Sequence, residues 1–163
     1  MQTRRPIRAD DLFRIAMVSD PQVSPDGRQV AFVITRMDRE ANCYRSGIWT
    51  VPVAGGQPRP LTAGTARDST PRWSPDGRWI AFLSTRDGDT PQLWCIPADG
   101  GEARQLTRLP EGVEQPVWSP RGDALAFVSK VRVGPAPQSD VRVIRTIRYR
   151  FDGEVSGRQV PAD

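Results

Sequence analysis

The 163-residue sequence contains no histidine and only two cysteines, Cys43 and Cys95. A chain without histidine cannot supply the base of a Ser-His-Asp triad. Two cysteines this far apart, with no histidine beside them, do not make a zinc site. We therefore expect no catalytic residue, no metal and no cofactor in this chain. The spacing leaves a disulfide open, although reduced thiols are the favoured state.

Long apolar runs and dense basic patches are missing as well. Residues 1–11 carry three arginines, but no apolar stretch long enough for a signal-peptide core or a membrane span follows them. The sequence therefore predicts a cytoplasmic protein with no membrane partner. Its 23 Lys and Arg residues are interleaved with 19 Asp and Glu residues, for a net charge of +4. Because nucleic-acid binding needs a more concentrated basic surface, we expect no nucleic-acid partner.

What the sequence does have is a repeated turn followed by a repeated apolar strand. In Ser-Pro-Asp-Gly, proline presets φ at the second position, aspartate tolerates the third and glycine accepts the left-handed conformation that follows. Each copy therefore predicts a hairpin turn, and the Ala-Phe strand behind it predicts core. The turn copies occupy residues 24–28, 74–78 and, as Ser-Pro-Arg-Gly-Asp, 119–123; the strands occupy 30–33, 80–83 and 125–128.

A tryptophan-bearing strand recurs behind the first two of these strands, at residues 48–52 and 93–97, and each copy leads to a Gly-Gly pair and then to Leu-Thr. With a first strand that bears Trp73 or Trp118, each repeat contains four antiparallel strands in about 45 residues, as in a propeller blade. The predicted fold is all-β, a partial β-propeller of four-stranded antiparallel blades. The predicted divisions are an amino-terminal extension (1–19), blade 1 (20–65), blade 2 (66–110) and an irregular, incomplete blade 3 (111–163).

The extension is predicted to contain a short helix over residues 9–18. Acidic residues at its start would favour the helix dipole, and Leu12, Ile15 and Ala16 would form its apolar side. The helix should end near Ser19-Asp20-Pro21, because the residue before proline avoids helical geometry.

The third repeat departs from the pattern. A Pro- and Gly-containing stretch at 133–137 replaces the compact link to the third strand, and residues 141–151 mix apolar and basic side chains in a strand-like run. This run is either an amphipathic strand with solvated arginines or a surface that faces an anionic ligand or a partner domain. Under the second interpretation the candidate substrate-facing residues are Arg148, Tyr149, Arg150 and Asp152.

Two further patterns favour structural interpretations. Ser24, Ser74 and Ser119 lie in the predicted turns with no candidate base, so they are not expected to be nucleophiles. The Asp-Gly-Asp sequence at 87–89 weakly resembles a calcium loop, but it falls where the second and third strands of a blade must be joined. We expect a plain turn there.

Three segments, at residues 18–27, 73–77 and 145–153, occur in an order that resembles acylaminoacyl-peptidase-like and dipeptidyl-peptidase-like members of the prolyl oligopeptidase family. The Trp-Ser-Pro-Asp-Gly repeat by itself is also typical of TolB-type propellers. The resemblance implies a propeller of about seven or eight blades that restricts access to an α/β-hydrolase domain with a Ser-Asp-His triad. That domain is expected to lie outside this chain, which has no Gly-x-Ser-x-Gly elbow.

The implied partners are a peptide substrate, bound through the hydrolase domain, and the remaining propeller blades. An alternative from another class is a non-enzymatic TolB-like propeller that acts as a protein-interaction scaffold. In either case the blades present here would leave apolar faces uncovered, so we expect self-association of the isolated chain.

Overall fold

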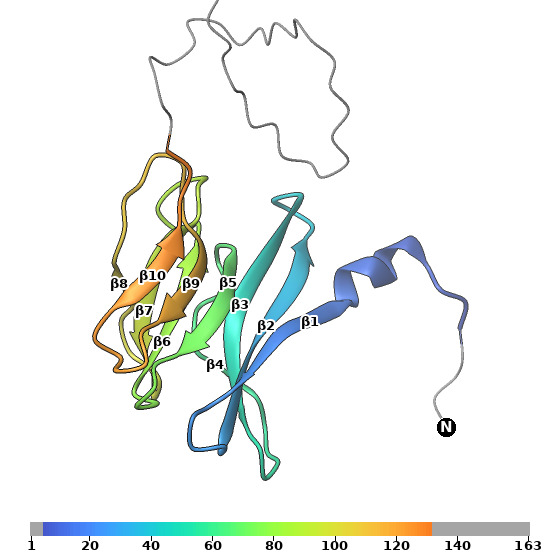
Figure 1. The fold of residues 1–163 in the computed structure, drawn as a ribbon. Coiled ribbons are helices and arrows are strands. Elements are labelled where there is room, and N and C mark those ends of the chain that lie inside the picture. The colour runs from blue at the N-terminus through green and yellow to red at the C-terminus, as the bar shows by residue number, and fades with distance from the viewer. Residues whose placement is uncertain (1–4, 132–163) are drawn as a thin grey trace, which may run out of the picture. The chain divides into compact units, whose positions relative to one another are not determined.

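The computed structural model describes residues 5–131, which consist mainly of antiparallel strands in three sheets (Figure 1). The first sheet contains β1 (Ala16–Val23), β2 (Gln29–Asp38), β3 (Cys43–Pro52) and β4 (Arg59–Pro60). The second contains β5 (Asp68–Trp73), β6 (Trp79–Ser84), β7 (Gln92–Pro97) and β8 (Arg104–Gln105). The third pairs β9 (Glu114–Trp118) with β10 (Leu125–Val128).

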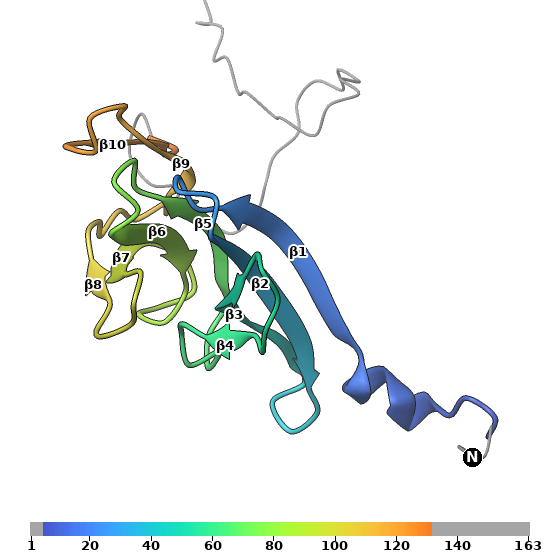
Figure 2. The ribbon, with the colours of Figure 1, turned by 90° about the horizontal axis from the view of Figure 1, so that it is seen from below.

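In both four-stranded sheets the spatial order follows the chain order, so each is an antiparallel meander of the kind that forms a propeller blade. The first strands, β1, β5 and β9, contact one another in succession, whereas β4 and β8 lie at the far edges of their sheets (Figure 2). The prediction of a partial β-propeller with four-stranded antiparallel blades is confirmed.

Each first strand is bent at the residue before a proline. The pairing of β1 with β2 shifts register between Ser19 and Gln22, and that of β5 with β6 shifts between Ser69 and Arg72. Such bulges strengthen the local twist of a strand. The residues at the bend have a positive φ, at Asp20 (48°), Thr70 (55°) and Gln115 (51°).

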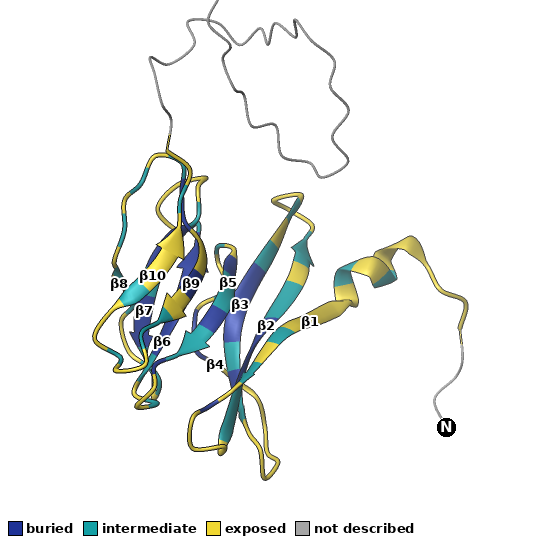
Figure 3. Cartoon of the chain, in the orientation of Figure 1, coloured by how far each residue is buried: buried dark blue, intermediate teal, exposed yellow. Residues whose placement is uncertain are grey.

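The core lies between successive sheets. One buried cluster joins Ala31, Val33 and Ile48 of the first sheet to Ile80, Phe82 and Ile96 of the second. A second cluster joins Ala81, Leu83 and Leu93 to Val113, with Trp118 and Leu125 packed against it. Buried positions therefore concentrate on β2, β3, β6 and β7, while β10 is largely exposed (Figure 3).

The helix predicted over residues 9–18 is wrong in its second half. A 3₁₀ helix, η1, spans only Ala9–Arg14, where the main-chain N–H of Arg8 donates to Asp11 Oδ2 at 2.9 Å. Ile15 is extended, and the next residues pair with β2 from Ala16 onward, so the first sheet includes residues assigned above to the extension. Strand pairing supplies these residues with main-chain partners in the sheet, which outweighs a weak local helical pattern.

Neither the predicted strand-like run at 141–151 nor the rest of the irregular third repeat after Val131 is among the described residues. Within residues 5–131, no helix is long and apolar enough to cross a membrane.

Candidate functional site in the clefts between blades

The serines of the first two turns are fully engaged in holding those turns. The Oγ of Ser24 donates to Asp26 Oδ1 at 2.6 Å and accepts the main-chain N–H of Gln29 at 2.9 Å. Ser74 repeats this arrangement with Asp76 at 2.5 Å and the N–H of Trp79 at 2.9 Å. Both serines are buried, and the one side chain to which each donates a hydrogen bond within residues 5–131 is the aspartate of its own turn. Their role is structural, as the sequence indicated.

The third turn reaches the same geometry with a different residue. Its third position holds Arg121, which cannot accept a hydrogen bond, but Ser119 Oγ instead donates to Asp123 Oδ1 at 2.7 Å. The main-chain N–H of Ala124 donates to Ser119 Oγ at 3.2 Å, as in the other copies. An aspartate two positions later thus replaces the missing one. From the sequence, this copy was predicted only as an altered form of the turn.

Hydrogen bonding keeps the turn carboxylates charged. The Ser24 hydroxyl, followed by the main-chain N–H of Arg28, lowers the pKa of Asp26. The Ser74 hydroxyl and the N–H of Arg78 lower the pKa of Asp76 in the same way. Carboxylates whose charged form is stabilised do not act as general acids near neutral pH. These aspartates can attract a cation or a hydrogen-bond donor, but they are not suited to proton transfer.

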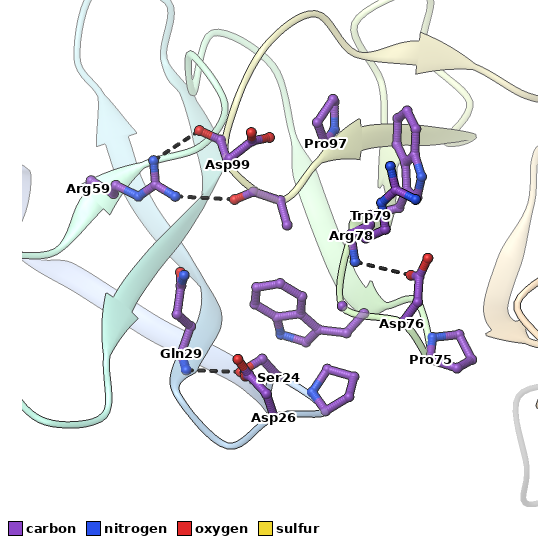
Figure 4. Close-up of a pocket in the computed structure, with 14 residues that line it drawn as sticks. Ser24, Asp26, Gln29, Arg59, Pro75, Asp76, Arg78, Trp79, Pro97 and Asp99 are labelled. Carbon is purple, nitrogen blue, oxygen red and sulfur yellow. Dashed lines mark hydrogen bonds between the residues drawn. The ribbon is translucent and has the colours of Figure 1, made fainter.

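A cavity of about 680 Å³ lies between the turn ends of the first two sheets (Figure 4). Arg59 crosses from the first sheet, with Nη1 donating to the carbonyl oxygen of Asp99 at 3.1 Å and Nη2 to that of Ala98 at 3.2 Å. The walls include the indoles of Trp73 and Trp79. Aromatic surfaces with a few charged groups are typical of a binding cleft, and this one has no paired nucleophile and base.

This cleft was not predicted from the sequence, because finding it requires knowing which repeats become neighbours. Arg59 lies two residues before the repeated Leu-Thr pair, as Arg104 does in the second blade, but the repeat does not show which residues Arg59 meets in the next blade. Asp99 belongs to the turn after the second tryptophan-bearing strand. The Gly-Gly pairs at 55–56 and 100–101 were the available signal, because they mark tight turns at the same end of each blade as the Ser-Pro turns.

Another cavity, of about 500 Å³, lies between the second sheet and the β9–β10 pair and contains Cys95. Burial raises the pKa of the Cys95 thiol to about 11, so it stays protonated at neutral pH and is a poor nucleophile. Within residues 5–131, no group of three or more Asp, Glu, Cys or His side chains could hold a metal ion. The candidate residues Arg148, Tyr149, Arg150 and Asp152 lie outside the described residues.

The model of the TolB beta propeller domain family matches residues 13–141, which include every strand described here. The chain belongs to this family. The chain is also similar to a peptidase: it is 45% identical over 87 residues to the uncharacterized peptidase YuxL of Bacillus subtilis (strain 168), an alignment that covers 53% of this chain and 13% of YuxL.

Solved structures agree with the family assignment. The uncomplexed acylaminoacyl peptidase of Pyrococcus horikoshii matches with a TM-score of 0.61 and 27% identity, over 76% of this chain and 19% of that one. The β-propeller domain of the Trilobed protease from Pyrococcus furiosus shares the fold, with a TM-score of 0.58 and 24% identity over 72% of this chain and 35% of that domain. The TolB-type chain thus spans only a fraction of the length of these relatives.

Proposed function

We propose that this chain is the amino-terminal propeller portion of a cytoplasmic serine peptidase that hydrolyses short peptides. The observation that carries the proposal is the 45% identity to a peptidase over 87 residues, together with the acylaminoacyl peptidase likeness at 27% identity. A chain with no histidine has no base for a Ser-His-Asp triad. Its contribution must therefore be accessory, and the triad would belong to an α/β-hydrolase domain outside this chain.

The accessory role we propose is control of substrate access. Buried clusters and cross-sheet hydrogen bonds hold the blades side by side as a packed wall. Such a wall over a hydrolase site would admit short or unfolded peptides and keep folded proteins out. The polar cleft near Arg59 offers groups that could contact a peptide on its way in.

Hydrolysis assays with three proteins test this proposal. The 163-residue chain alone should hydrolyse no acyl-aminoacyl, prolyl or dipeptidyl reporter above background. The longer protein that contains this chain should hydrolyse at least one of them, and a serine-directed inhibitor should block it. Removing the propeller from the longer protein should then allow cleavage of larger substrates relative to short ones. An unchanged size preference would contradict the gating role, and a longer protein without any hydrolase domain would contradict the peptidase assignment.

The scaffold alternative gains its support from the family itself, since the matching model is named for TolB propellers. It differs from the peptidase proposal in one measurement. A scaffold should leave a serine-reactive fluorophosphonate probe unbound in the longer protein, whereas a peptidase should be labelled on one serine outside residues 1–163.

A further inference from the structure

In the second blade, an arginine and a serine hold a buried carboxylate that belongs to the chain itself. Asp68 is 1% exposed, and both of its carboxylate oxygens lie 3.0 Å from Arg86 Nη2. The hydroxyl of Ser84 donates to the same carboxylate at 2.6 Å. The guanidinium of Arg86 lies over the ring of Trp94, 4.8 Å from its centroid. An arginine placed between an indole and a carboxylate makes a charge-assisted pair with a fixed orientation.

The first blade repeats the arginine and the tryptophan of this site. Phe32 pairs with Trp49 as Phe82 pairs with Trp94, and Arg36 follows the first phenylalanine at the same distance in sequence as Arg86 follows the second. The guanidinium of Arg36 lies over the ring of Trp49, 5.7 Å from its centroid.

The first blade lacks the acid, however. Val18 lies opposite Ile34 at the register position where Asp68 lies opposite Ser84. The two groups that hold the carboxylate site together in the second blade are thus replaced by apolar side chains. Within residues 5–131, no carboxylate forms an ion pair with Arg36.

Space is present at this position. Arg36 and Trp49 line a cavity of about 400 Å³, together with Gly47 and Gly64. By the 45-residue repeat, these glycines occupy the positions of Gln92 and Leu109 in the second blade. Neither glycine carries a side chain into this cavity, and their backbones approach closely, since a Cβ on Gly47 would lie 3.1 Å from the Cα of Gly64.

The other charges in the cavity are already paired. Asp38 accepts the Nε–H of Arg45 at 2.6 Å and the main-chain N–H groups of Glu40 and Ala41. Arg45 also donates to the carbonyl oxygen of Thr65. Arg36 is thus the cation that remains available in this cavity, and the nearby Asp38 carboxylate would disfavour a doubly charged anion such as phosphate.

We propose that this cavity binds a single carboxylate of an acidic peptide segment, with Arg36 as its ion partner and Trp49 as its wall. In the second blade the equivalent arginine and tryptophan, Arg86 and Trp94, hold a carboxylate, which the chain itself supplies as Asp68. The site goes beyond the proposed peptidase role, since it requires neither hydrolysis nor gating.

Titration of the 163-residue chain with short blocked peptides tests the site, with the Trp49 indole N–H followed by NMR and assigned with Trp49→Phe. One peptide carries an internal glutamate with both ends capped, and a second carries its carboxylate only at the carboxyl terminus. An isosteric glutamine peptide with capped ends has no carboxylate. A saturable shift with either carboxylate peptide supports the proposal, and the two arms identify the source of the carboxylate. Equal shifts with the glutamine peptide, or no shift with either carboxylate peptide, would overturn it.

Three substitutions separate the site from nonspecific attraction. Arg36→Gln should weaken binding about tenfold or more, because it removes a charged hydrogen-bond partner. Arg28→Gln, which changes another exposed arginine at the turn end of the same sheet, should leave binding unchanged. Val18→Asp should abolish the response, because the new carboxylate would occupy Arg36 as Asp68 occupies Arg86.

Val18 is 64% exposed and Arg36 is also exposed, so these variants should fold. Peptide binding that survives Val18→Asp, or that is weakened as much by Arg28→Gln as by Arg36→Gln, would also overturn the site. None of these readouts depends on peptidase activity, so a failure here would leave the proposed function standing.

Discussion

The indole Nε1 of Trp73 donates to the main-chain carbonyl oxygen of Gln22 at 3.0 Å, across the junction between the first and second sheets. Trp118 makes the same bond, also at 3.0 Å, to the carbonyl oxygen of Arg72 at the next junction. Gln22 and Arg72 occupy the same position in successive repeats, immediately after the bend and proline of each first strand. One tryptophan in each of the second and third repeats thus fixes its blade to the one before it, whereas the first repeat has Val23 at this position.

Substitution of Trp73 should show how much this junction contributes to the free energy of unfolding. The side chain packs against the buried cluster between the first two sheets, so Trp73→Ala should cost about 3 kcal/mol or more of stability. Trp73→Phe keeps most of the packing but leaves the Gln22 carbonyl unpaired, and should cost about 1 kcal/mol. Denaturant unfolding followed by circular dichroism measures both.

Arg67→Ala is the control for this series. Arg67 is exposed in the loop before β5 and its side chain donates to the carbonyl oxygen of Tyr44 at 3.2 Å. Arg67→Ala should lower the free energy of unfolding by no more than Trp73→Phe does. If Arg67→Ala and Trp73→Ala destabilise equally, Trp73 does not hold the junction.

The third turn offers a test of whether Asp123 replaces the aspartate of the other two copies. Asp123→Ala removes the acceptor of the Ser119 hydroxyl and should lower stability by about 0.5–1 kcal/mol. The double variant Arg121→Asp, Asp123→Arg recreates Ser-Pro-Asp-Gly-Arg and should recover most of that loss. Chemical denaturation midpoints of the unchanged chain, Asp123→Ala and the double variant test this prediction. A double variant no more stable than Asp123→Ala would mean that the turn does not use the aspartate in this way.

The turn carboxylates predict a pH dependence with a defined sign. Because hydrogen bonds lower the pKa of Asp26 and Asp76 below the ordinary value of 3.8 in the folded chain, their contribution to stability is present above about pH 4. It is lost as the pH falls through the lowered folded-state values. Carboxyl carbon NMR should show both midpoints below 3.8.

Ser24→Ala should raise the pKa of Asp26 and leave that of Asp76 unchanged, which makes the second turn an internal control. The Ser24 hydroxyl is the largest cause of the lowered value, and the main-chain N–H of Arg28 would remain after the substitution. The Asp26 midpoint should therefore stay at or below its ordinary value. An unshifted Asp26 midpoint in Ser24→Ala would show that the hydroxyl is not what stabilises the charge.

The blades were predictable because their signals are local and repeated. The Ser-Pro-Asp-Gly turn, with Gly27 at φ 71° and Gly77 at φ 72°, encodes a hairpin within a few residues. The amino-terminal helix was overpredicted because the partner of residues 16–19 is β2, which lies beyond the turn in sequence. A local apolar pattern carries no information about that pairing.

The candidate sites were harder to predict, because they depend on neighbouring repeats and on what a repeat lacks. The candidate residues predicted from the sequence, at 148–152, were chosen where the repeat breaks down, and they lie outside the described residues. The Arg36 cavity arises within a regular blade. It can be recognised only by comparing Val18 with Asp68, which occupy the same position in the strand pairing of their blades.

The β10 strand exposes side chains that its counterpart in the second blade buries. Phe127 is 40% exposed whereas Phe82 is fully buried, and Val128 is 51% exposed whereas Leu83 is 6% exposed. Within residues 5–131, β10 pairs only with β9, so its other edge has no strand partner in that range. Exposed apolar faces and unpaired strand edges both promote association.

We therefore predict that the isolated chain self-associates with increasing concentration, as measured by static light scattering. Val128→Lys should lower the apparent mass at a given concentration, because it places a charge on the exposed face of β10. Val53→Lys is the matched control: Val53 is 56% exposed, but it follows β3 in a turn away from β10. A strictly monomeric chain with cooperative unfolding would show that the face of β10 is covered by the chain itself, and equal effects of the two lysines would show that charge alone sets the association.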